Sequence, residues 1–259
     1  MSFSNPIKLF LFISSLTSAV VVYSPAVFSL QSSPYSLHKK TLNNPLVVDR
    51  QSVAIDYYEQ AQLYNEFDSV ENNMSRVANL LTKSAELSYG LAQMDLAHLY
   101  IKGLGVVQSN VLAASWFQKA ADQGFVAAQY NLANLYHLGI GVKKDESQAR
   151  HYYRLAANQG LANAQFNLAL MYRFGLGGEE DSIQVAKWFE AAAKQGHGEA
   201  QFQLAEMYSL GQGVYKNNKK AHYWYKHAME NGVRDAREKL QKILPLMKET
   251  GSEESVVLN

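Results

Sequence analysis

The sequence predicts an all-α fold, an α/α superhelical solenoid built from pairs of antiparallel helices. The first observation behind this prediction is a period of 36 residues that runs through four consecutive units without a gap. A period of this length is typical of stacked supersecondary units. The second observation is that apolar residues inside each unit recur at helical spacing. The recurring columns include Gln93, Gln129, Gln165 and Gln201; Leu96, Leu132, Leu168 and Leu204; Tyr100, Tyr136, Tyr172 and Tyr208; and the glycine pairs that begin at Gly103, Gly139, Gly175 and Gly211.

The unit from Phe125 to Gly160 shows why two helices are expected in each repeat. Ala127 to Leu138 carries apolar residues on one face, which predicts a first helix, called helix A. Asp145 to Asn158 has the same spacing and predicts a second, helix B. Two antiparallel helices leave one apolar face open, and we expect the next repeat to cover it.

Both helices carry signals at their ends. Gly139-Ile140-Gly141 is expected to end helix A, because glycine adopts the left-handed conformation that closes a helix. Asp145 or Ser147 is a candidate N-cap for helix B. Gln159-Gly160 ends helix B and leads the chain into the next repeat.

The array has degenerate ends. Residues 53–88 align with the repeat but lack its glycines, which predicts a capping repeat before the four full repeats at 89–232. Residues 233–245 are predicted as a C-terminal capping helix that ends at Pro245, because proline disrupts the helical hydrogen-bond pattern. We expect residues 246–259 to be a disordered tail.

The first 29 residues predict a targeting segment outside the fold. Lys8 precedes an apolar run from Leu9 to Val22, and small residues suited to cleavage follow, as in a secretory signal peptide. An uncleaved membrane anchor over residues 9–30 is the alternative, since that length nearly spans a bilayer. Residues 30–52 predict a linker. We therefore expect an exported protein, either periplasmic or secreted, or one that this segment tethers to the membrane.

Composition and motifs argue against catalysis and nucleic-acid binding. A net charge of +1, from 24 basic and 23 acidic residues, provides no basic footprint for nucleic acid. The chain has no cysteine, which excludes a disulfide framework and a thiolate nucleophile. None of the seven histidines belongs to a His-Glu-x-x-His motif, and no Gly-x-Ser-x-Gly elbow occurs. We predict that the protein is not an enzyme and has no catalytic, cofactor-binding or metal-binding residues. The acidic run Glu179-Glu180-Asp181 is expected to interact with a helix dipole rather than a metal.

The repeat unit resembles the Sel1-like repeat, a relative of the tetratricopeptide repeat. The resemblance rests on Ala-Gln-x-x-Leu-Ala-x-x-Tyr-x-x-Gly-x-Gly-Val at residues 92–106 and Ala-x-x-Trp-Phe-x-x-Ala-Ala-x-x-Gly at residues 113–124. It implies right-handed α/α superhelices and a scaffold whose partner is a protein or peptide.

Two other functions stay open beside the scaffold. One is a structural component of a bacterial envelope machine, such as a flagellar motor or a secretion complex. The other is a hydrolase of β-lactams or the cell wall, an activity that the resemblance associates with cysteine-rich members. The absence of cysteine and of any nucleophile–base pair weighs against the hydrolase.

The candidate binding site is a polar ladder on the A helices, which line the concave side of stacked helix pairs. Amide side chains both donate and accept hydrogen bonds, so such a ladder can hold the backbone of an extended peptide. A solvated helix face is the plainer interpretation of the same pattern. The candidate peptide-binding residues are Asp95, Asn131, Asn167 and Gln203 in one column and His98, Asn134 and Glu206 one turn later, where the third repeat has Leu170.

Aromatic residues form two further columns on the B helices. A stacking platform for sugars or bases is one interpretation of such a stripe. Its helical spacing instead predicts the buried face of an amphipathic helix. The columns contain Trp116, Trp188 and Trp224, and Phe117, Tyr153, Phe189 and Tyr225.

Overall fold

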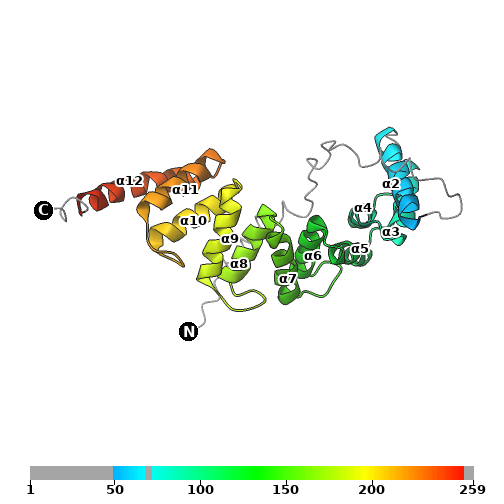
Figure 1. Cartoon of the computed structure of the whole chain (residues 1–259), viewed down its shortest axis with the longest axis horizontal. Coiled ribbons are helices and arrows are strands. Elements are labelled where there is room, and N and C mark those ends of the chain that lie inside the picture. Colours follow the sequence, from blue (N-terminus) through cyan, green and yellow to red (C-terminus); the bar gives the residue numbers. More distant parts are fainter. Residues whose placement is uncertain (1–48, 68–71, 254–259) are drawn as a thin grey trace. The chain divides into compact units, whose positions relative to one another are not determined.

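The computed structural model describes residues 49–67 and 72–253, and within them the chain forms eleven α-helices and no strand (Figure 1). The predicted all-α fold of helix pairs is therefore confirmed. The expected targeting segment and most of the expected linker lie outside the described residues. The helices are α2 (Arg50–Phe67), α3 (Asn72–Glu86), α4 (Gly90–Lys102), α5 (Asn110–Asp122), α6 (Val126–Leu138), α7 (Glu146–Asn158), α8 (Ala162–Arg173), α9 (Ser182–Lys194), α10 (Gly198–Leu210), α11 (Asn218–Glu230) and α12 (Asp235–Glu253).

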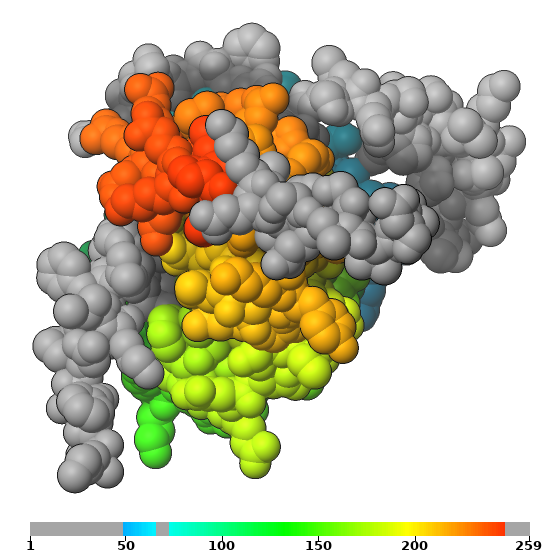
Figure 2. Space-filling model, turned by 90° about the vertical axis from the view of Figure 1, so that its left-hand side faces the viewer, coloured from blue at the N-terminus to red at the C-terminus, as the bar shows by residue number. Residues whose placement is uncertain are grey.

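The helices divide into two units. Unit 1 contains the described residues up to Leu135, together with Ile140–Val142. Unit 2 contains Tyr136–Gly139 and the described residues from Lys143 onward. In unit 1 consecutive helices pack against one another from α2 to α5, and in unit 2 they do so from α7 to α12. In Figure 2 the visible surface of unit 2 passes from orange through gold to yellow-green, as expected for helices stacked in chain order.

Side-chain caps begin the B helices of all four repeats. Asp145 accepts hydrogen bonds from the backbone amides of Ser147 and Gln148 at 2.9 and 3.0 Å, so the prediction of Asp145 as N-cap is confirmed. Asp181 caps α9 in the same way. The acidic run Glu179-Glu180-Asp181 therefore lies at the N-terminus of a helix, where the sequence predicts that it interacts with the helix dipole. Ser109 and Asn217 occupy the equivalent positions before α5 and α11.

The two glycines of each Gly-x-Gly pair have different roles. Gly103 and Gly211 adopt left-handed φ angles of 68° and 73° and close α4 and α10. The second glycine lies against the backbone at the start of the preceding helix B. A Cβ on Gly141 would overlap the carbonyl oxygen of Asn110, the first residue of α5. This close approach requires the absence of a side chain, in addition to the positive φ that the sequence predicts.

The core follows the periodic columns. Leu96, Leu132, Leu168 and Leu204 are fully buried, and so are the small residues beside them, such as Ala97 and Ala133. The aromatic columns also belong to the core: Phe117, Tyr153, Phe189 and Tyr225 are buried, as are Tyr152 and Trp188, whereas Trp116 and Trp224 are half-buried. The interpretation of these columns as core is confirmed.

Two boundaries differ from the predictions. The prediction that the capping helix ends at Pro245 is wrong, because α12 continues through this residue to Glu253. Proline removes one hydrogen bond to the carbonyl four residues earlier, that of Gln241, which is an exposed residue where water can replace the lost donor. Residues 246–253 are consequently helical rather than part of a disordered tail. At the other end, α2 begins at Arg50 inside the expected linker, where Asp49 accepts a hydrogen bond from the amide of Gln51 at 3.1 Å.

Candidate functional site

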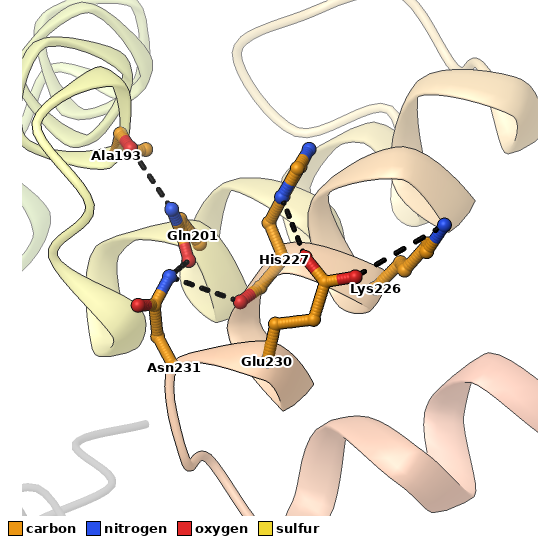
Figure 3. Close-up of polar contacts among 6 residues, drawn as sticks. All are labelled: Ala193, Gln201, Lys226, His227, Glu230 and Asn231. Carbon is orange, nitrogen blue, oxygen red and sulfur yellow. Dashed lines mark hydrogen bonds and ion pairs between the residues drawn. The ribbon is translucent and has the colours of Figure 1, made fainter.

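A buried glutamine in helix A links each repeat to its surroundings. The side-chain amide of Gln201 donates to the carbonyl of Ala193 in α9 at 3.0 Å, and its oxygen accepts from Asn231 at 2.9 Å (Figure 3). Gln165 makes the equivalent bonds to Ala157 and Gln195. In unit 1, Gln93 bonds with Ala85 and Gln123 in the same way. This column therefore holds helices together, a role that its periodicity alone did not specify.

The polar ladder begins in unit 1 with a half-buried carboxylate. Asp95 accepts hydrogen bonds from the hydroxyl of Tyr58 and the amide of Gln62, both at 3.1 Å. Burial raises the pKa of Asp95, and these two hydrogen bonds oppose the rise. Tyr58 and Gln62 lie on α2, so the ladder extends into the degenerate capping repeat.

The next rung of unit 1 joins His98 to Asn131. The amide nitrogen of Asn131 lies 3.4 Å from Nε2 of His98, one repeat earlier. Burial lowers the pKa of His98, which favours the neutral imidazole as the partner of an amide. Asn131 and Asn134 are only 5% and 4% exposed, so these side chains lie inside the packed face. His98 to Asn131 and Gln62 to Asp95 both span 33 positions, which identifies a repeated contact between neighbouring A helices.

Unit 2 repeats this contact once and replaces it once. Lys239 on α12 donates to Glu206 on α10 at 2.5 Å, again across 33 positions. At the preceding junction the third repeat has Leu170, which cannot form a hydrogen bond from its side chain. Arg173, one turn later on α8, donates to the side-chain oxygen of Gln203 instead. We call Arg173, Gln203, Glu206 and Lys239 the unit 2 strip.

The structure thus separates the seven predicted residues. Asp95, His98, Asn131 and Asn134 lie in unit 1, and Asn167, Gln203 and Glu206 lie in unit 2. Asn131, Asn134 and Asn167 are buried, whereas the other four are partly exposed. The polar side chains on this face of the A helices are not simply solvated, because several of them form hydrogen bonds with neighbouring helices. Peptide binding at these residues stays a prediction.

Four residues of the network were missed in the sequence. Gln62 stands 36 positions before His98, and Lys239 stands 36 positions after Gln203, so extending the period into the end helices would have found both. Tyr58 stands 36 positions before Met94, in a largely apolar column that continues with Tyr130, Phe166 and Phe202 and that does not predict a hydrogen-bonding residue. Arg173 has no periodic signal. The residues equivalent to Arg173 in the other repeats are Ile101, His137 and Ser209, and a periodic search does not select an isolated residue.

The described residues add two further findings. They contain no group of three or more His, Cys, Asp or Glu side chains placed to hold a metal ion. No described helix is long and apolar enough to cross a membrane, and the candidate anchor at residues 9–30 lies outside the part of the chain covered by that finding.

A family model described as the Sel1 repeat matches residues 90–125, 126–161, 162–197 and 198–233, which together make up more than half of the chain. The chain belongs to the Sel1 repeat family. Sel1 repeat proteins serve as protein-interaction scaffolds and are generally non-catalytic. The four matched segments are the helix pairs from α4/α5 to α10/α11.

Solved structures of Sel1 repeat proteins resemble this chain. A Sel1 repeat protein from Oxalobacter formigenes is 31% identical with a TM-score of 0.63, and the match covers 76% of this chain and 79% of that one. The protective antigen c5321 of uropathogenic Escherichia coli, which displays an SLR fold, is 29% identical with a TM-score of 0.68. That match covers 76% of this chain but only 44% of the antigen, so this chain corresponds to less than half of its length. No curated protein sequence matches this chain.

Proposed function

We propose that this Sel1 repeat protein is an exported scaffold that binds a segment of a partner protein on the unit 2 strip. The strip suits this role because its four side chains are partly exposed and come from three helices, α8, α10 and α12. Their charged and amide groups donate and accept hydrogen bonds at the surface.

The observation that carries the proposal is a contrast between columns of the repeat. Several buried columns keep the same residue in all four repeats, as Leu96, Leu132, Leu168 and Leu204 show. The two ladder columns vary more: the residue changes between most repeats, although Asn131 and Asn167 are alike, and the columns end in Gln203 and Lys239 in one and Glu206 in the other. Residues that only hold neighbouring repeats together can be identical at every junction, whereas a surface that differs along the array can distinguish one partner from another.

Peptide selection tests the binding function. Short random peptides displayed on phage are selected on the full chain, and enriched peptides are synthesised and titrated. Lys239→Ala removes a strip cation, and Lys226→Ala is the matched control because Lys226 is also a surface lysine that pairs with a glutamate, Glu230. We expect binding to weaken in Lys239→Ala alone. Enrichment of no sequence above that on an unrelated protein would contradict the function, and equal binding by both variants would contradict the site.

Export is the second part of the proposal. It is supported by the apolar segment at residues 9–22 behind Lys8, and the similarity to a protein described as a protective antigen fits a location outside the cytoplasm. Residues 1–48 fused to alkaline phosphatase, which is active only after export, provide the test. Activity is expected in bacteria, and the N-terminus of the mature full chain distinguishes a cleaved signal peptide from a retained anchor. An inactive fusion would contradict export.

A further inference from the structure

Arg173 is a largely buried cation for which no ion-pair partner appears in the described structure. Its guanidinium donates to the neutral oxygen of Gln203 and lies 5.0 Å from the ring centre of Phe189. Burial lowers the pKa of Arg173, and the negative charge of Glu206 only partly offsets this effect. A desolvated charge that contacts only neutral groups is costly unless a counter-ion completes its environment.

The nearest carboxylate is already engaged with another cation. Glu206 pairs with Lys239 at 2.5 Å, and this hydrogen bond raises the pKa of Lys239. The side chains of Glu206 and Lys239 are 28% and 42% exposed, so the pair lies at the surface beside the Arg173–Gln203 contact. With two cations and one carboxylate, the unit 2 strip carries one positive charge in excess.

We propose that the unit 2 strip recognises an acidic side chain in an extended segment of a partner protein, with Arg173 as the residue that binds its carboxylate. This inference rests on the proposed function and specifies the chemistry of the partner. Guanidinium is suited to the task because its planar set of donors matches the two oxygens of a carboxylate. The hydrogen bond to Gln203 uses only part of that set and fixes the orientation of the rest.

The charge one turn away favours a peptide over a uniformly anionic surface. Glu199 precedes Gln203 by four positions on α10, and Asp235 precedes Lys239 by four positions on α12. Burial and the neighbouring Asp235 raise the pKa of Glu199, as expected for two like charges in proximity. Negative charge beside the strip repels phosphate-rich surfaces such as anionic membranes or nucleic acid. A single acidic residue in a peptide can reach Arg173 without placing further negative charge beside Glu199.

Peptide selection on three variants of the full chain tests the inference. Arg173→Gln removes the cation, and Arg154→Gln is the matched control because Arg154 is an exposed arginine on α7 of the same unit. Gln203→Glu supplies an internal carboxylate next to Arg173, so it is expected to occupy the guanidinium while raising the thermal midpoint. It therefore tests the site in a protein that remains folded, even if Arg173→Gln does not.

The expected result is enrichment of peptides with Asp or Glu at one fixed position, bound about tenfold or more weakly by both Arg173→Gln and Gln203→Glu, since a charge-assisted pair is lost. Arg154→Gln should bind like the wild type, and added salt should weaken binding. Enriched peptides without an acidic position would overturn the inference and leave the scaffold function standing, whereas no enrichment at all removes both. Acidic peptides that bind all variants equally would also overturn it, as would Arg173-dependent binding to phosphatidylserine vesicles without acidic peptides.

Discussion

Individual side chains form two kinds of hydrogen bond between helices of this protein. The buried glutamines repeat the same pair of bonds in every repeat for which the structure gives both, as at Gln93, Gln165 and Gln201. The ladder residues keep the geometry of the contact but change its chemistry, from Gln62–Asp95 to Glu206–Lys239. Uniform bonds hold the repeats in register, and variable bonds give unit 2 its particular surface.

Gln165→Ala is expected to reduce the free energy of unfolding by about 1–3 kcal/mol, because it removes two hydrogen bonds between helices, one donated to the carbonyl of Ala157 and one accepted from the side chain of Gln195. Gln148→Ala is the control, since Gln148 is exposed, and it should change stability by less than about 0.5 kcal/mol. Denaturant titration measures both. Equal effects would show that the buried glutamines do not hold the helices together.

Asp95→Asn is expected to stabilise the protein at neutral pH. Because the folded protein raises the pKa of Asp95, the stability that this group contributes is full below its ordinary pKa and is lost as pH rises through the folded value. Asparagine keeps an acceptor oxygen for Tyr58 and Gln62 without the charge. Unfolding measured across pH should show the advantage of the variant at neutral pH and its disappearance in acid. A variant less stable than the wild type at neutral pH would contradict this assignment.

Whole elements depend on backbone contacts that side-chain patterns do not reveal. Each Gly-x-Gly segment follows the end of one helix, and its second glycine also lies against the backbone at the start of helix B of the preceding repeat, as Gly141 does against Asn110. The glycine that ends helix B has a positive φ but no close neighbour, as at Gly124. Two glycine columns with equal periodicity therefore have different tolerances to a side chain.

Gly141→Ala should consequently destabilise the protein more than Gly124→Ala. The left-handed conformation costs a non-glycine residue about 1–2 kcal/mol at either position. Only at Gly141 does the new methyl group also overlap the carbonyl of Asn110. Thermal unfolding of the two variants measures the difference, and a smaller loss for Gly141→Ala would be inconsistent with the close approach.

Ala133→Leu tests the packing of helix α6. Ala133 has no exposed surface, so a larger side chain is expected to cost about 1–3 kcal/mol by overpacking. Ala127→Leu makes the same change at an exposed position of the same helix and should have little effect. Unchanged denaturant midpoints for Ala133→Leu would refute the assignment of this column to the core.

Across the whole molecule, the features that recur in every repeat were predictable from the sequence. The features that depend on contacts between neighbouring helices were not. Helix pairs, the Asp145 cap and the aromatic core follow from local spacing, and the period strengthens each of them. The burial of Asn131 and Asn167 was not predictable in this way, because it depends on how closely adjacent helices pack. Arg173 was missed because it occurs in one repeat only. The helix end predicted at Pro245 was wrong because the cost of a proline inside a helix depends on whether water reaches the carbonyl that loses its donor.

Hydrogen exchange of the full chain, with and without its best selected peptide, tests the scaffold function most directly. Binding on the unit 2 strip predicts that amide protection will increase in α8, α10 and α12, the helices that supply Arg173, Gln203, Glu206 and Lys239. The outward parts of α9 and α11 should exchange as before. Protection confined to α9 and α11, or exchange that the peptide leaves unchanged throughout unit 2, would contradict a docking surface on the A helices.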